Sequence, residues 1–271
     1  MHTGRLYGKA PFELFLLHGG PGAAGSIRPL AEMLAGSNGK ASRAPGIVEA
    51  IQTQHSIDSV TLELRHQIEL YSATRPVTLI GHSWGAWLAI LYATRYPADV
   101  RRIILISTPP FEVRYADMIT TRREARLDAE QRTAFKRAVA TLESCEGHTP
   151  QQQAALLEVE RLTNISDNVE AIPFVNDMPF DAAAYTALWP EAVRLRNDGR
   201  WHDILRTIDC PITVIHGRKD PHPAEGVTEP LTRAGVEFDA HILDLCGHTP
   251  FLESHAATKV KQIILSSINS R

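Results

Sequence analysis

The sequence has little cysteine and no long hydrophobic run near its start. The three cysteines among 271 residues, Cys145, Cys210 and Cys246, are widely spaced and odd in number. This pattern fits reduced thiols better than a disulfide framework, and no cysteine pair has the spacing of a metal site. The longest early apolar run, residues 12–17, is interrupted by Glu13 and is too short for a secretory signal or a membrane span. We therefore expect a cytoplasmic protein without a membrane partner.

An excess of charge of either sign is also missing. The formal net charge is -3 and the isoelectric point is near 6.5, so no overall field attracts nucleic acid or an anionic membrane surface. We expect neither as a partner. The hydrophobic share of 44% is high enough to exclude general disorder. A chain of this length can form one large α/β domain or a domain that carries an insertion.

Short apolar runs alternate with longer helical patterns, which indicates parallel strands joined by crossover helices. The predicted strands are residues 12–17, 46–52, 76–80, 102–106, 211–215 and 237–245, and the predicted helices are residues 57–71, 84–96, 224–234 and 250–268. Residues 111–208 lack a good strand candidate but contain several helical stretches. We therefore predict an α/β core formed by residues 1–110 and 209–271, with residues 111–208 as a helical insertion covering one end of the sheet.

The segment from Gly81 to Gly85, GHSWG, places one serine between two glycines, directly after a predicted strand and before an apolar helix. A serine hydroxyl needs a base to remove its proton, so it must project from a tight turn that a histidine and a substrate can both reach. Side chains at the flanking positions would collide with neighbouring backbone, which explains the glycines. The helix N-terminus favours negative charge that develops beside the serine. The pattern predicts Ser83 as a nucleophile.

Three further motifs follow predicted strands, where open parallel sheets bind their ligands. Residues 18–22, HGGPG, form a glycine-rich turn whose N–H groups could bind an oxyanion together with the N–H of Trp84, although the turn could also be a simple chain reversal. Asp220, in GRKD, could orient a catalytic histidine, although Asp-Pro is also a common turn pair. His248, in GHTP, has a suitable pKa for a general base, and we expect it at the start of the last helix. The chain order of serine, acid and histidine matches one hydrolase fold.

Through HGGPG, GHSWG, GRKD and GHTPFLE the sequence resembles the α/β-hydrolase superfamily over nearly its whole length. The resemblance implies Ser83 as nucleophile, His248 as base and then acid, Asp220 as orienting carboxylate, and the N–H groups of Gly20 and Trp84 as the oxyanion hole. It also implies a helical cap at the insertion.

HGGPG and Ser-Trp-Gly are similar to motifs of proline iminopeptidases, which remove N-terminal proline from peptides. Those enzymes hold the substrate ammonium with acidic cap residues. Glu158, Glu160 and Asp167 could serve here, and no motif selects among them.

The sequence departs from the superfamily pattern in two places. Only about ten residues precede the first predicted strand, so we expect the antiparallel strands that usually open this fold to be shortened or missing. In place of the usual Asp-x-x-Gly-x-Gly turn, residues 48–53 read VEAIQT, which alters one wall of the site.

Several other residues have a plainer interpretation than catalysis. We expect His82 and His216 to pack or hydrogen-bond, His18 to brace the glycine loop, and Cys246 to lie in the core. We expect the arginine-rich helix to present a solvated face; it contains Arg122, Arg123, Arg126, Arg132 and Arg137. We expect Trp189 and Trp201 to be packing residues. The spacing of His216, Asp220, His222 and His248 matches no metal site, so we expect neither a metal nor a cofactor.

The leading functional hypothesis is a serine hydrolase that cleaves an ester or amide bond of a small molecule or short peptide through Ser83, His248 and Asp220. We prefer a small-molecule carboxylesterase, with a proline iminopeptidase-type aminopeptidase as the close alternative. A non-hydrolytic ligand-binding protein is the alternative of another class, because the same fold hosts both.

Overall fold

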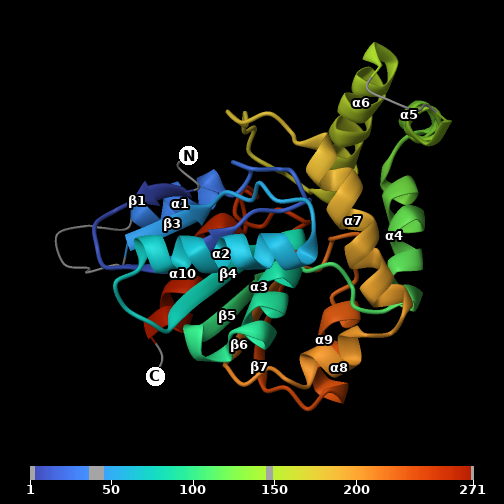
Figure 1. Ribbon diagram of the computed structural model, residues 1–271. Coiled ribbons are helices and arrows are strands. Elements are labelled where there is room, and N and C mark those ends of the chain that lie inside the picture. Colours follow the sequence, from blue (N-terminus) through green and yellow to red (C-terminus); the bar gives the residue numbers. More distant parts are fainter. Residues whose placement is uncertain (1–3, 37–45, 145–148, 270–271) are drawn as a thin grey trace.

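The computed structural model describes residues 4–36, 46–144 and 149–269, and its centre is a seven-stranded sheet (Figure 1). The strands, in the spatial order β1-β3-β2-β4-β5-β6-β7, are β1 (Gly4–Tyr7), β2 (Phe12–Leu17), β3 (Gly46–Ala50), β4 (Val77–His82), β5 (Val100–Ile106), β6 (Ile212–Gly217) and β7 (Phe238–Leu243). Only β1 pairs antiparallel, with β3. The mostly parallel sheet with a short antiparallel edge confirms the predicted fold class.

The helices fall into two groups by their place in the chain. Those that accompany the strands are α1 (Arg28–Ala35), α2 (Ile57–Tyr71), α3 (Trp84–Arg95), α9 (Glu225–Arg233) and α10 (Ala257–Asn269). Between β5 and β6 lie α4 (Val113–Arg126), α5 (Ala129–Ser144), α6 (Pro150–Asp167), α7 (Ala182–Asn197) and α8 (Trp201–Leu205). Figure 1 shows α4 to α7 gathered on one side of the sheet. Of the helices within the described ranges, none combines the length and apolar character that crossing a membrane requires.

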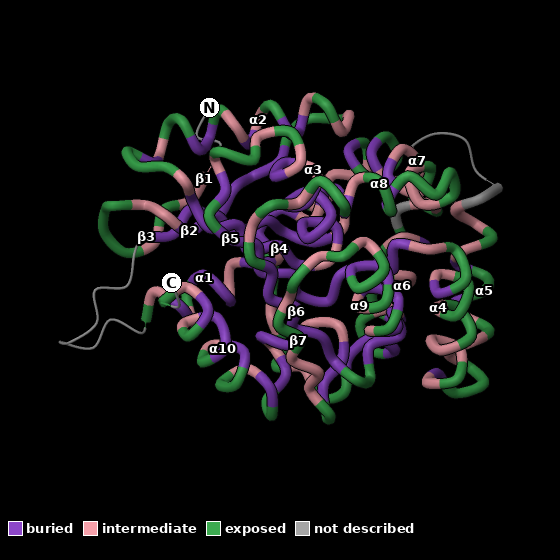
Figure 2. The backbone as a smooth tube through the Cα atoms, turned by 90° about the horizontal axis from the view of Figure 1, so that it is seen from below, coloured by how far each residue is buried: buried purple, intermediate pink, exposed green. Residues whose placement is uncertain are grey.

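Alternating side chains of the strands supply two separate apolar cores. In β2, Leu14 and Leu16 join a core with residues of α1 and α10, whereas Phe15 and Leu17 join the core that includes α2 and α3. This follows from the two-residue period of a strand, which sends successive side chains to opposite faces. Figure 2 shows the resulting buried centre with the more exposed helices around it. Both faces of the sheet are therefore covered, and its strand ends remain the place for loops that carry function.

Aromatic side chains join α3 to the start and end of the segment between β5 and β6. The Trp87 ring of α3 lies 4.8 Å from Trp201, 5.9 Å from Trp189 and 6.4 Å from Phe111, measured between ring centroids. The Trp87 indole N–H donates to Pro109 O at 3.0 Å. Trp189 and Trp201 are thus packing residues, as the sequence predicted.

A cavity of about 370 Å³ adjoins these aromatic residues where the helical segment leaves and rejoins the sheet. Its lining comprises Phe111, Glu112, Val113, Arg196, Asn197, Gly199, Trp201, His202 and Pro230. None of the motif residues lines it, so this cavity is separate from the candidate site.

The structure differs from the sequence expectations at three helices and one strand. Helix α1 was not predicted, and the antiparallel edge that was expected to be shortened or missing is the four-residue strand β1, which was not among the predicted strands. The predicted arginine-rich helix is two helices, α4 and α5, because Asp128 lies at a break where its carboxylate accepts the backbone N–H of Gln131. The last helix begins at Ala257 rather than at residue 250, since the backbone of Glu253 forms an isolated antiparallel β-bridge with Ala171. His248 therefore lies on a loop, well before α10.

We expect replacement of Trp201 by alanine to lower the free energy of unfolding by about 4 kcal/mol, the usual cost of removing a buried aromatic side chain. Trp201 is 1% exposed, and its indole N–H has no hydrogen-bond partner among the described residues. Trp201→Phe should therefore cost less than Trp201→Ala, because it keeps most of the packing and removes an unsatisfied donor. Urea unfolding would measure both changes.

Leu70, which is 69% exposed, provides the control. Leu70→Ala should change the free energy of unfolding by only about 0.5 kcal/mol. Equal losses for Trp201→Ala and Leu70→Ala would contradict a structural role for the aromatic contacts.

Candidate active site

Ser83 occupies a strained turn between β4 and α3. Its backbone angles are φ 53° and ψ -120°, a region that non-glycine residues seldom adopt and that costs about 1–3 kcal/mol. The glycines beside it permit very close backbone approach. A Cβ atom at Gly81 would lie 2.2 Å from Gly85 O, and one at Gly85 would lie 2.2 Å from Leu17 O. Close packing between strand and helix thus requires both glycines and holds the half-buried Ser83 in its turn.

The glycine-rich loop after β2 lies beside Ser83. A Cβ atom at Gly19 would be 3.4 Å from Ser83 Cβ, and Gly20 has a positive φ of 32°. Trp84 is the first residue of α3, where backbone N–H groups have no partner inside the helix. Gly20 and Trp84, the predicted oxyanion-hole residues, therefore belong to two segments that meet around the serine.

His18 and Gln52 form hydrogen bonds at the junction between the glycine-rich loop and α3. The buried His18 ring donates from Nδ1 to Gly19 O at 3.0 Å, and its Nε2 faces the backbone N–H of Gln52 at 3.4 Å. The Gln52 side-chain oxygen accepts the Trp84 indole N–H at 2.7 Å. Burial lowers the pKa of His18 to about 4, so the ring is neutral, consistent with one donating and one accepting nitrogen. His18 thus braces the loop, as predicted.

Gln52 was missed because it lies where the sequence departs from the family pattern, in VEAIQT. The only sign in the sequence that Gln52 belongs to the site was this departure from the family pattern. The altered wall of the site consequently supplies a side chain that links the glycine loop to the indole of Trp84.

The buried Asp220 and the partly buried His248 form a pair at the ends of neighbouring strands. Asp220 follows β6, His248 follows β7, and His248 Nδ1 donates to Asp220 Oδ2 at 2.8 Å. Burial disfavours the charged imidazolium, but the adjacent carboxylate outweighs burial and raises the pKa of His248 above its ordinary value. Burial likewise opposes ionisation of Asp220, yet the His248 and His222 rings hold its pKa well below the usual range. Since Nδ1 carries a proton, Nε2 is the nitrogen left to act as a base.

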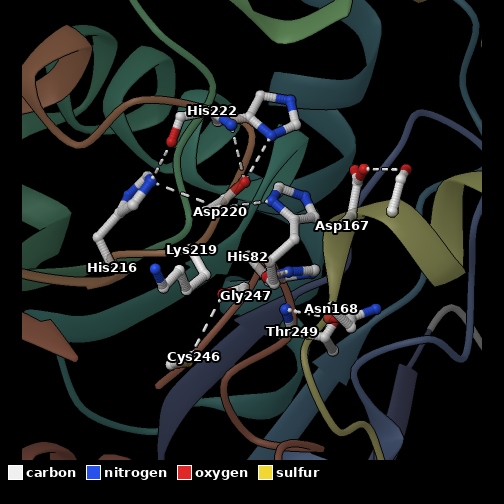
Figure 3. Close-up of polar contacts among 12 residues, drawn as sticks. His82, Asp167, Asn168, His216, Lys219, Asp220, His222, Cys246, Gly247 and Thr249 are labelled. Carbon is white, nitrogen blue, oxygen red and sulfur yellow. Dashed lines mark hydrogen bonds and ion pairs between the residues drawn. The ribbon is translucent and has the colours of Figure 1, made fainter. Parts of the chain in front are cut away.

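Three more histidines contact the same carboxylate or the loop that carries His248. His222 Nδ1 donates to Asp220 Oδ1 at 2.9 Å, and His216 Nε2 lies 3.4 Å from Asp220 Oδ2 while donating to His222 O at 2.8 Å. His82 Nε2 donates to His248 O at 2.9 Å. This hydrogen bond places the loop that carries His248 against His82, the residue before Ser83. Figure 3 shows His216 and His222 directed toward Asp220. The hydrogen-bonding roles predicted for His82 and His216 agree with these contacts.

The loop that carries His248 is fastened to the end of α6. The His248 N–H donates to Asp167 O at 2.7 Å, and the Thr249 N–H donates to the side chain of Asn168 at 3.0 Å. The buried Glu253 carboxylate accepts the N–H groups of Gly247, Val169 and Glu170. Residues 167–172 and 247–254 therefore form one hydrogen-bonded unit, which we call the base-loop clamp; Figure 3 shows its contact between Thr249 and Asn168.

Arg123 of α4 completes the clamp through a buried ion pair. Its guanidinium donates to both oxygens of Asp167, and Ser166 Oγ donates to Asp167 Oδ1 at 2.8 Å. Arg126 donates to the carbonyl oxygens of Ser166 and Lys219. The expectation of a solvated arginine face is therefore wrong for Arg123 and Arg126, because carboxylate and carbonyl acceptors from distant segments surround them.

Asp220, His222 and His248 each offer a potential metal ligand within 4.8 Å of one another. Nδ1 of both rings already donates to the carboxylate. A cation could use these nitrogens only by displacing both protons. The hydrogen bonds thus account for the grouping of the three side chains.

The residue geometry agrees with relationships found by sequence and structure comparison. The sequence profile of the alpha/beta hydrolase family matches residues 14–260. This span includes the serine turn, Asp220 and His248. The protein belongs to the alpha/beta hydrolase family.

The names of similar proteins indicate more than one activity. The chain is 25% identical over 278 residues to an abhydrolase domain-containing protein, abhd-5.2, of Caenorhabditis elegans (96% of this chain, 60% of the relative). It is 25% identical over 277 residues to a proline iminopeptidase of Lactobacillus delbrueckii subsp. lactis (94% and 89%). A monoacylglycerol lipase of Bos taurus is 22% identical over 218 residues (79% and 62%). The chain thus spans less than two thirds of the length of the first and third of these relatives.

Solved structures share the fold at low sequence identity. The crystal structure of VinJ has a TM-score of 0.64 and 16% identity, with 98% of this chain and 93% of that chain covered. This similarity confirms the α/β-hydrolase fold.

We expect Arg123→Met to lower the free energy of unfolding by about 3 kcal/mol near neutral pH, because it leaves the Asp167 carboxylate buried without its cation. Burial opposes ionisation of Asp167, and Arg123 outweighs burial and lowers its pKa. The stabilisation is therefore present above the unfolded pKa, near 3.8, and is lost as pH falls through the lower folded pKa. In the variant Asp167 is protonated more readily, so the stability loss should be smaller at pH about 5 than at pH about 7.

Urea unfolding at the two pH values would measure this difference. Arg137→Met is the control, because Arg137 is an exposed arginine of the neighbouring helix α5. Equal stability of the two variants would contradict the contribution of the ion pair.

Proposed function

We propose that the protein is a cofactor-independent serine hydrolase in which Ser83, His248 and Asp220 act as a catalytic triad. The observation that carries the proposal is the 2.8 Å hydrogen bond between His248 and the buried Asp220, on a loop held beside the strained turn of Ser83. A strained serine, an oriented histidine and a buried carboxylate together are the requirements for an activated hydroxyl nucleophile.

In this mechanism Ser83 Oγ attacks the substrate carbonyl carbon while His248 Nε2 takes the hydroxyl proton. The carbonyl oxygen becomes an oxyanion, which the N–H groups of Gly20 and Trp84 stabilise. When the tetrahedral intermediate collapses, His248 returns its proton to the leaving alcohol or amine. Water then attacks the acyl-serine, with His248 again acting first as base and then as acid, and the free acid leaves. Asp220 keeps Nδ1 protonated and stabilises the imidazolium in both halves.

We propose residues 111–208 as the cap that selects the substrate, and we favour a small carboxylic ester over a peptide with N-terminal proline. The state of the acidic candidates in α6 supports this preference. Both oxygens of Asp167 are bonded to Arg123, and Glu158 forms two hydrogen bonds with Arg161. Glu160 is exposed to solvent. None of the three is a buried carboxylate free to hold an ammonium, whereas an uncharged ester needs no such partner.

Proline iminopeptidase activity is the second candidate. The similarity to the iminopeptidase of Lactobacillus delbrueckii subsp. lactis over most of both chains supports it. The cytoplasmic location expected from the sequence stays a prediction.

A fluorophosphonate probe should label the wild-type protein and fail to label Ser83→Ala, because only an activated serine reacts at a useful rate. Ester hydrolysis should fall by a factor of about 10⁴ or more in this variant. Ser107→Ala is a matched control: Ser107 is the other described non-glycine residue with positive φ, at 47°, but it is fully buried. Labelled protein would be detected by mass spectrometry. Unlabelled wild-type protein would favour a ligand-binding protein of the same fold.

A short-chain nitrophenyl ester should be turned over faster than a proline nitroanilide at equal concentration. The reason is that none of Glu158, Glu160 and Asp167 is a buried carboxylate free to hold the proline ammonium. Absorbance of the released chromophore measures both rates, and Ser83→Ala supplies the background for each. Faster cleavage of the anilide would replace the esterase proposal with the iminopeptidase one.

A further inference from the structure

His222 makes a second imidazole contact with the carboxylate that orients His248. Asp220 divides its two oxygens between the rings: Oδ2 accepts from His248 Nδ1 at 2.8 Å, and Oδ1 accepts from His222 Nδ1 at 2.9 Å. Oδ1 also accepts the backbone N–H of His222 at 2.9 Å. Because a carboxylate only accepts hydrogen bonds, both rings carry their proton on Nδ1.

The two rings also touch each other. The centroids of His222 and His248 are 4.4 Å apart, and their planes differ by 27°. Pro221 and Pro223 flank His222 and restrict its backbone. His216 Nε2 holds the carbonyl of His222 at 2.8 Å. A rigid, buried imidazole thus forms one wall for the His248 ring.

On the basis of the proposed triad, we propose that His222 is a positioning residue for the base: its Nδ1–H fixes Asp220 Oδ1, so that Oδ2 faces His248, and weakens the pull of the carboxylate on the His248 proton. The first effect limits rotation of the carboxylate. The second follows because a hydrogen bond to a carboxylate disperses part of its negative charge. His222 therefore keeps His248 available as a base at a lower pH than Asp220 alone would allow.

The charges around the rings are consistent with a neutral His222. Burial lowers its pKa to about 4, against the opposing attraction of Asp220. The other groups that face the two rings are Arg123 from α4, Asp167 from α6, His82 from β4 and His216 from β6. Arg123 and Asp167 neutralise each other, and burial lowers the pKa of both His82 and His216. Asp220 therefore remains the main partner of His248.

Two variants separate the hydrogen bond from the ring contact. His222→Phe keeps a flat ring but removes the N–H. His222→Asn removes the ring but keeps an N–H donor at a comparable distance from the backbone. We expect the acid limb of kcat/KM, measured with a nitrophenyl ester, to move upward in His222→Phe by about 0.5 to 1 pH unit, with kcat reduced about fivefold. His222→Asn should return the limb to within about 0.2 pH unit of wild type.

In the wild type this limb should lie above the ordinary histidine pKa, because Asp220 raises the pKa of His248 and only the neutral ring acts as a base. His66→Phe, at an exposed histidine of α2 outside the proposed cap, should leave the profile unchanged.

Nuclear magnetic resonance of isotope-labelled imidazoles tests the inference without any substrate. The His248 signal, assigned by its loss in His248→Gln, should titrate at higher pH in His222→Phe than in wild type or His222→Asn. Identical titration in all three proteins would overturn the proposal, as would equal shifts in both variants. If the titration shifts as expected but the fluorophosphonate probe does not label Ser83, the positioning role stands and the hydrolase proposal fails.

Discussion

The buried negative charge of Asp220 is the interaction on which the site depends. A carboxylate in the interior is unfavourable unless donors surround it, and here the donors come from its own turn and from the loop after β7. The two strand ends are thereby held at a defined separation. The His248 ring, which would accept a proton from Ser83 in the proposed mechanism, is oriented by the same hydrogen bond that helps stabilise the buried charge. The hydrogen bond between His248 and Asp220 therefore both stabilises the buried charge and orients the His248 ring.

The serine turn is held by a different means, which is close packing of backbone. The strain at Ser83 persists because β4 and α3 are both tied to the sheet, and the Ser83 N–H donates to Ile106 O at 2.9 Å. Glycine at positions 81 and 85 lets helix and strand approach more closely than any side chain would permit. The hydroxyl is thus presented by rigid elements rather than by a flexible loop.

Features that depend on local pattern were predictable from the sequence. Six strands follow from short apolar runs, and Asp220 and His248 were found because each follows such a run in the required order. Contacts between distant segments were not predictable. Arg123 looks like any surface arginine of a charged helix until Asp167, 44 positions away, is brought beside it. Glu253 resembles an ordinary helical residue, yet its carboxylate accepts the backbone N–H groups of Val169 and Glu170 from a distant segment and of Gly247 from its own loop. Helix periodicity carries no information about such partners.

The base-loop clamp has a consequence for how substrate preference can change in this protein. One way to change substrate preference is to exchange the segment that contacts the substrate and to keep the catalytic residues. Here the end of α6 supplies both the carbonyl that receives the His248 N–H and the amide that receives the Thr249 N–H. A transplanted helical segment would have to reproduce these acceptors at the same positions. A change of the helical segment that lost these acceptors would therefore also disturb the loop that carries His248.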